Sequence, residues 1–231
     1  MALISGVIYG LARLTYYTGL KYEEVSRFIP LLAMGPIFVT IYSYFFLGIS
    51  FVWQIYLGIF LVILGAVLVS LKNPLDFKHS FQSKTAVILG ILAAFFYAVK
   101  DVSTKIASNS ITFWPLIFWI GVGFMLISLL MVADKINKLN NNTKALRHLA
   151  GVGALKAIGY FVFTKAITLG PVALVVTMLQ IKSLFVFIGS TLISRYHPEI
   201  IHEKLDKKTL LQKGAATIII IAGVSLVKLF S

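Results

Sequence analysis

Residues 171–194 form an apolar run of membrane length that carries a lysine, Lys182, near its middle. A charge at the centre of a bilayer costs about 2.5 kcal/mol or more, so we expect the Lys182 ammonium to face a protein interior, water or a ligand rather than lipid. On a helix, the Lys182 face is otherwise mostly apolar, and Gln180 lies to one side of it. Such a face suits the lining of a cavity, and it suits helix packing nearly as well.

A second lysine, Lys156, lies in the middle of the preceding apolar run and shares a helical face with Tyr160. Neither Lys156 nor Lys182 has an acidic residue one helical turn away. If both helices line one cavity, the two ammonium groups would attract an anionic substrate, and Tyr160 or Gln180 would add hydrogen bonds. The alternative is that each cation snorkels or pairs with backbone carbonyls and helix C-termini. The candidate substrate-binding residues, which all lie in apolar runs, are Lys182, Lys156, Tyr160, Gln180, Arg27 and Lys100.

Asp101 is the one acidic residue that we expect inside the membrane. Lys105 lies one turn C-terminal to it, and this spacing favours a local ion pair near the end of a span. The other interpretation makes Asp101 a proton-coupling carboxylate, because proton relays in membrane proteins use such groups. Asp101 is therefore the candidate ion-coupling residue.

Signatures of enzymes and metal sites are missing from the sequence. It contains no cysteine, no Gly-x-Ser-x-Gly motif and no P-loop. The segment His202-Glu203-Lys204-Leu205-Asp206 begins like a zinc-protease motif, but Asp206 stands where the second histidine is required. We therefore predict that the protein is not an enzyme and that it has no catalytic residues, no metal site and no cofactor.

The composition places these residues in a membrane. The chain is 59% hydrophobic and only 13% charged, with a mean hydropathy of +0.93, and a soluble domain of 231 residues would not show such values. The net charge of +13 comes mostly from Lys and Arg in short gaps between apolar runs, where they determine topology. We therefore expect the lipid bilayer as the surroundings and no nucleic-acid partner.

The apolar runs are about as long as a helix that crosses a bilayer, roughly 20 residues. Their lengths favour helices over the short alternating strands of a barrel. The predicted fold class is an all-α polytopic membrane protein with about eight transmembrane helices and kinks near Pro30, Pro36 and Pro115. The predicted spans are 2–20, 26–47, 51–71, 84–106, 112–133, 148–168, 171–194 and 210–230.

The gaps between these runs differ in charge. Loops 72–84, 134–147 and 194–209 are rich in lysine and emerge on one face if every run spans the membrane. The loops of the opposite face carry almost no cations. The positive-inside rule therefore places the lysine-rich face in the cytoplasm and both termini outside.

An internal repeat organises the chain. A shift of 147 residues aligns the first three spans with the last three, after a further shift beyond loop 194–209. The copies lie an odd number of spans apart, so they cross the membrane in opposite senses. An inverted repeat with a site near the midplane is a transporter architecture. The aligned pairs include Val25 with Val172, Leu32 with Leu179, Phe38-Val39 with Phe185-Val186, and Gly65 with Gly223.

The pattern resembles the EamA-type proteins of the drug/metabolite transporter (DMT) superfamily. It reads TYYTGLKYEEVSRFIPLLAMGPIFVTIYSYFFLGI followed by YLGIFLVILGAVLVSL, and later GYFVFTKAITLGPVALVVTMLQIKSLFVFIGSTLIS followed by GAATIIIIAGVSLV. The resemblance implies a partial first half of three helices at 1–72 and a second half of five helices at 84–231.

Three features depart from the family pattern. Such proteins usually have ten helices, and the first two of the first half have no counterpart here. The acidic residue common after the fourth helix of each half is absent, with Gly48 near that place in one copy and Arg195 in the other. Family members usually keep both termini in the cytoplasm, whereas the charge asymmetry places them outside.

We therefore expect a secondary transporter in the cell membrane that moves a small organic metabolite, an anion or a zwitterion, by alternating access. The excess of unpaired cations suggests the charge of this substrate. The alternative is a non-transporting membrane subunit, or a truncated remnant, that completes its bundle with a partner or as a homodimer.

Overall fold

The computed structural model describes residues 1–23, 25–70, 83–132, 143–182 and 207–230, and also Phe185, Ile188, Gly189, Leu192 and Tyr196. All regular structure in these residues is helical. In chain order the helices are α1 (Ala2–Gly19), α2 (Val25–Leu32), α3 (Gly35–Leu47), α4 (Trp53–Ser70), α5 (Lys84–Ser108), α6 (Phe113–Val132), α8 (Thr143–Leu169), α9 (Val172–Met178) and α11 (Lys207–Phe230), with the short 3₁₀ helix η3 (Leu179–Ile181) after α9.

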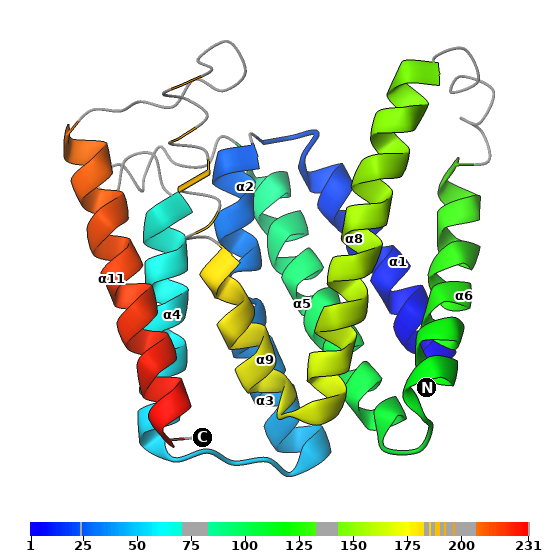
Figure 1. Ribbon diagram of the computed structural model, residues 1–231, viewed down its shortest axis with the longest axis horizontal. Helices are drawn as coiled ribbons and strands as arrows, with labels where there is room; N and C mark the ends of the chain where they lie inside the picture. The colour runs from blue at the N-terminus through cyan, green and yellow to red at the C-terminus, as the bar shows by residue number, and fades with distance from the viewer. Residues whose placement is uncertain are drawn as a thin grey trace.

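The helices stand side by side (Figure 1). Figure 1 shows α4 and α11 paired at one edge, α6 and α8 at the other, and α5 and α9 between them. Corresponding helices of the two copies run in opposite directions: α1 against α8, α3 against α9, and α4 against α11. This is the antiparallel relation that the inverted repeat predicts, and it confirms the predicted all-α fold.

The helices vary in length. Four are long and apolar enough to cross a membrane: Lys84–Ser108, Phe113–Met131, Arg147–Leu169 and Leu211–Phe230. Shorter apolar helices occupy Gly35–Leu47, Trp53–Leu68 and Val172–Ile181. These segments overlap seven of the eight predicted spans, and α1 overlaps the first. Most of residues 183–194 in the predicted span 171–194 lie outside the described residues.

Two predicted spans are not continuous helices. The run 26–47 is divided into α2 and α3 by a turn at Ala33 and Met34, and Pro36 occupies the first turn of α3. Proline is favoured there because its missing N–H would be unpaired in any case. In the run 171–194, α9 ends at Met178 and passes into η3, which ends one residue before Lys182.

The two interruptions correspond to each other in the repeat. Adding the shift of 147 to residues 33 and 34 gives 180 and 181, which lie in η3. The interrupted elements also pack together, since α3 and α9 share a core cluster that includes Val39, Val172 and Val176. Interrupted helices that meet inside a membrane are a recurrent feature of transporter binding sites.

Glycines allow the closest helix contacts. A Cβ on Gly6 of α1 would collide with the Ile120 carbonyl oxygen and lie against the backbone of Gly123 on α6. Gly58 of α4 and Gly223 of α11 face each other in the same way. These contacts are possible because small residues let the two backbones approach.

Candidate functional site

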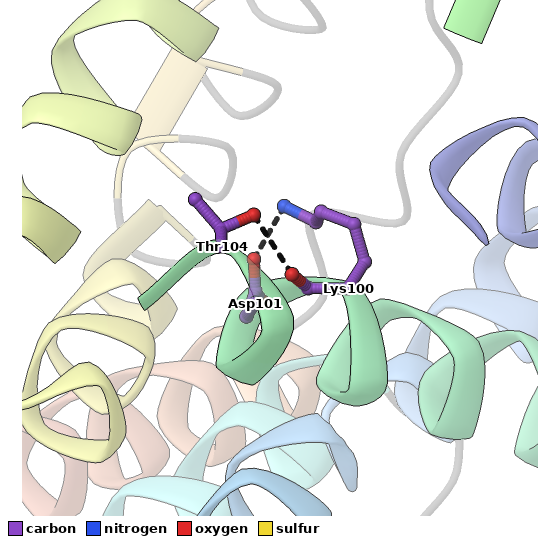
Figure 2. Close-up of polar contacts among 3 residues, drawn as sticks. All are labelled: Lys100, Asp101 and Thr104. Atoms are coloured by element: carbon purple, nitrogen blue, oxygen red, sulfur yellow. Dashed lines mark hydrogen bonds and ion pairs between the residues drawn. The ribbon is translucent and has the colours of Figure 1, made fainter. Parts of the chain in front are cut away.

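Helix α5 carries two adjacent charged residues into the interior of the bundle. The helix begins at Ser83, whose side chain accepts a hydrogen bond from the Ala86 N–H. Further along, Lys100 and Asp101 are only 3% and 5% exposed, and they form an ion pair. Figure 2 shows the Lys100 side chain turning back toward the Asp101 carboxylate, while the Thr104 hydroxyl donates to the Lys100 carbonyl oxygen at 2.8 Å.

Aromatic rings from two other helices surround the Lys100 ammonium. Its Nζ lies 5.3 Å from the ring centroid of Tyr9 on α1, and 5.2 and 5.1 Å from those of Tyr160 and Phe163 on α8. Tyr9 and Tyr160 stack, with centroids 5.0 Å apart and planes inclined by 12°. Ring faces attract cations most strongly where water is excluded, so the rings and Asp101 together compensate the buried charge.

Lys105 binds the end of α8 rather than Asp101. Its Nζ donates to the carbonyl oxygens of Ile167 at 3.0 Å and Thr168 at 3.2 Å, in the last turn of that helix. The predicted Asp101–Lys105 ion pair is therefore wrong. The α8 C-terminus offers Lys105 unpaired carbonyls and the negative end of a helix dipole, and Lys100 takes the carboxylate.

Lys182 directly follows η3 and is exposed in the isolated chain. Its charge and that of Asp101 act on each other electrostatically. Gln180, inside η3, is only 5% exposed. Asp101 thus pairs with the neighbouring cation of its own helix, and Lys182 lies at the interruption of the 171–194 run.

No contact with the Lys100–Asp101 pair is described for two of the predicted site residues, Lys156 and Arg27. Lys156 is exposed on α8, one turn before Tyr160, and makes no hydrogen bond or ion pair with the described residues. Arg27 belongs to α2, and its side chain lies outside the described part of the structure. The described residues bring together Lys100, Asp101 and Tyr160, whereas a cavity lined jointly by Lys156 and Lys182 stays a prediction.

Tyr9 and Phe163 are site residues that the sequence patterns did not single out. Phe163 follows Tyr160 by three residues, so a helical face shared by two aromatic residues was available as a signal. Tyr9 lies between Gly6 and Gly10 in α1, and Gly6 packs closely on the backbone of α6. It is also the ring nearest Arg13, whose guanidinium carbon lies 5.4 Å from its centroid.

This arrangement has the chemistry of a binding site for a charged solute. The pair presents one positive and one negative group side by side within an aromatic wall, and Lys182 adds a second positive charge. A small solute that carries a carboxylate, with or without an ammonium group, has the complementary chemistry.

Comparison with known proteins identifies the chain's relatives at the level of family and fold. Residues 1–71 and 84–229 match the family model described as the EamA-like transporter family. A crystal structure titled only "Crystal structure of protein" superposes with a TM-score of 0.73 at 13% sequence identity, covering 98% of this chain and 75% of that one. No curated protein matches the sequence.

Proposed function

The chain belongs to the EamA-like transporter family, and we propose on this premise that it is a secondary transporter of a small organic anion or zwitterion. It is an integral membrane protein, and we place it in the cell membrane. The two antiparallel copies of the repeat would rock against each other and expose the site to each side in turn. No chemical conversion of the solute is involved.

The observation that carries this proposal is the buried Lys100–Asp101 pair with its aromatic wall. Burying two charges costs several kcal/mol per ion before their attraction is counted, and replacing such a pair by apolar residues often stabilises a protein. A membrane protein that keeps the pair therefore gains something other than stability from it. A substrate carboxylate would approach Lys100 and Lys182, and a substrate ammonium would approach Asp101 and the face of Tyr160.

Asp101 is also the residue that we propose for ion coupling. It is the one carboxylate inside the described membrane helices, and its charge balance depends on Lys100 and Lys182. If a proton and the substrate compete for this carboxylate, a proton gradient can drive transport. Gln180 is buried and precedes Lys182 by two residues, and it would contribute a hydrogen bond when the site is occupied.

The test is ligand-induced thermal stabilisation of the purified protein, followed by uptake into proteoliposomes. The panel consists of small anions, zwitterionic amino acids and organic cations. We expect anions or zwitterions to stabilise the parent, and expect Lys100→Met and Lys182→Ala to weaken this effect by about tenfold in apparent affinity. Asp101→Asn should retain substrate exchange and lose accumulation driven by a proton gradient.

Lys165→Met is the matched control, because Lys165 is a lysine of α8 whose Nζ lies 4.8 Å from the ring centroid of Phe113. It should transport as the parent does. If organic cations alone stabilise the protein, the proposed substrate charge is wrong. If nothing on the panel binds and no solute is exchanged, the non-transporting subunit becomes the better interpretation.

A further inference from the structure

Arg13 is a second cation on the face of α1 that carries Tyr9, one helical turn further along. Its guanidinium carbon lies 5.4 Å from the ring centroid of Tyr9 and 5.8 Å from that of Tyr17. Its Nη1 donates to the Tyr17 hydroxyl at 3.5 Å. Among the described residues its interaction partners are all tyrosines, since Tyr97 of α5 also acts on it electrostatically. Phenol rings hold a guanidinium in place without neutralising it, so its positive charge remains available to an anion.

The face of α1 that carries Tyr9 and Arg13 points into the bundle. The Tyr9 ring meets rings of three other helices, with centroid distances of 6.2 Å to Tyr97 of α5, 4.8 Å to Phe124 of α6 and 5.0 Å to Tyr160 of α8. Arg13 follows Tyr9 by four residues, and residues four apart on a helix share a face. Arg13 therefore belongs to the side of α1 that meets other helices, and its side chain is half-buried there.

One aromatic ring joins Arg13 to the proposed substrate site. The Tyr9 ring centroid lies 5.4 Å from the Arg13 guanidinium carbon and 5.3 Å from the Lys100 Nζ. The two positive charges can therefore lie no farther apart than these two distances placed end to end. A short solute with an anionic group at each end can reach both cations at once.

The repeat supports a role for this position in the site. With the shift of 147, Arg13 of α1 corresponds to Tyr160 of α8. Tyr160 lies at the site, with its ring centroid 5.2 Å from the Lys100 Nζ. The two helices contact each other there, because Tyr9 and Tyr160 stack. Equivalent positions of two antiparallel copies face one shared space near the midplane.

We propose, on the basis of the function proposed above, that Arg13 binds a second anionic group of the substrate, so that the transported solute is a small dicarboxylate. One carboxylate lies at Lys100 and the other at Arg13. The guanidinium offers two parallel N–H groups to a carboxylate, and the Tyr17 hydroxyl can donate to the same group. An acidic amino acid belongs to this class, since its ammonium group can approach Asp101.

The test compares ligands that differ only in the second charge. Succinate is paired with succinamate and glutamate with glutamine, because each amide has nearly the shape of the carboxylate that it replaces. Apparent affinities come from thermal stabilisation of the purified full chain at constant ionic strength. We expect the parent to bind each dicarboxylate about tenfold more tightly than its amide, the usual difference for a hydrogen-bonded charge.

Arg13→Gln should abolish this preference and leave the affinity for the amides unchanged, because the amides depend on the Lys100 end alone. Lys100→Met should weaken both members of each pair, since they share the carboxylate that Lys100 binds. Arg13→Lys keeps the charge without the planar fork and should retain part of the preference. Lys165→Met, which changes a lysine of α8 beside Phe113, should keep all of it.

Equal affinities of the parent for the two members of each pair would overturn the second anionic site and leave the proposed function intact. A preference that survives Arg13→Gln would do the same. If neither the dicarboxylates nor the amides bind, the proposed function fails together with the second site.

A second measurement needs no substitution at position 13, and it applies even where Arg13→Gln does not fold. Phenylglyoxal modifies arginine, and peptide mass spectrometry separates Arg13 from Arg147, which is exposed near the start of α8. Succinate at about ten times its apparent dissociation constant should slow the modification of Arg13 about tenfold, whereas succinamate should not. Arg147 should react equally throughout. An Arg13 that reacts as fast with succinate as without it, or that does not react in the absence of anions, would contradict the site.

Discussion

At the scale of single residues, the main feature of the molecule is the buried ion pair of Lys100 and Asp101. Adjacent positions on a helix normally point apart, yet here both side chains enter the same buried space. The three rings and the carboxylate compensate the ammonium, whereas Lys100 compensates the carboxylate. Removing either charge alone should therefore lower the stability of the fold, although the pair as a whole need not stabilise it.

Lys100→Met should destabilise the protein by about 3 kcal/mol, because it leaves the buried Asp101 carboxylate without its ion-pair partner. The double variant Lys100→Met and Asp101→Leu should recover most of this loss, since it removes both charges. The measurement is reversible unfolding of the two single variants and the double variant in detergent. A double variant whose loss equals the sum of the single losses would show that the two residues act independently.

The sequence revealed that these charges lie in a span but not which partners they choose. The i to i+4 spacing favoured Asp101 with Lys105, a rule that holds for a helix surface in water. In a bundle, the end of α8 lies within reach of Lys105, and its carbonyls need donors as much as the carboxylate does. Such choices depend on the positions of other helices, which spacing along one helix does not contain.

At the scale of elements, the contact of α1 with α6 depends on a glycine pair. A Cβ on Gly123 would collide with the Leu3 carbonyl oxygen and lie 2.9 Å from the Val7 amide nitrogen. Both of those atoms belong to the α1 backbone, which cannot rotate away as a side chain does. The two helices must therefore separate to admit even one methyl group.

Gly123→Ala should accordingly lower the stability of the protein by about 2 kcal/mol or more, because overpacking forces the two backbones apart. Gly121→Ala is the matched control on the same helix, since a Cβ there meets no atom within 4 Å. It should be neutral or stabilising by less than about 1 kcal/mol. The measurement is the thermal unfolding of the two variants and of the parent. Equal effects of the two substitutions would contradict the close contact between α1 and α6 at Gly123.

The positions of the spans were predictable from hydropathy, but their interruptions were only partly so. Pro36 indicated a kink in the run 26–47, and the structure has a turn just before it. The 3₁₀ segment at Leu179–Ile181 has no proline within it, and only its correspondence to the first break in the repeat would have located it. Hydrophobic periodicity along the sequence identifies a continuous helix, but it does not show where packing against other helices interrupts that helix.

At the scale of the whole molecule, the antiparallel copies place both termini at the same end of the bundle. The connections after α3, α5 and α8 lie at one end of the bundle with both termini, and the N-terminal end of α8 lies at the other (Figure 1). The cation-poor loops of the sequence are these same connections. Charge and fold therefore agree on which segments share a side, whereas the side itself depends on the positive-inside rule.

That rule predicts that the shared end faces outward. Single cysteines at Ser50 and Asn109 mark this end, and one at Arg147 marks the opposite end of α8. In right-side-out vesicles, a membrane-impermeant maleimide should label Ser50→Cys and Asn109→Cys at once and Arg147→Cys only after permeabilisation. The reverse pattern would give the orientation usual in the family, with both termini in the cytoplasm. Labelling that separates position 50 from position 109 would instead contradict the arrangement of the spans, because an even number of crossings must lie between them.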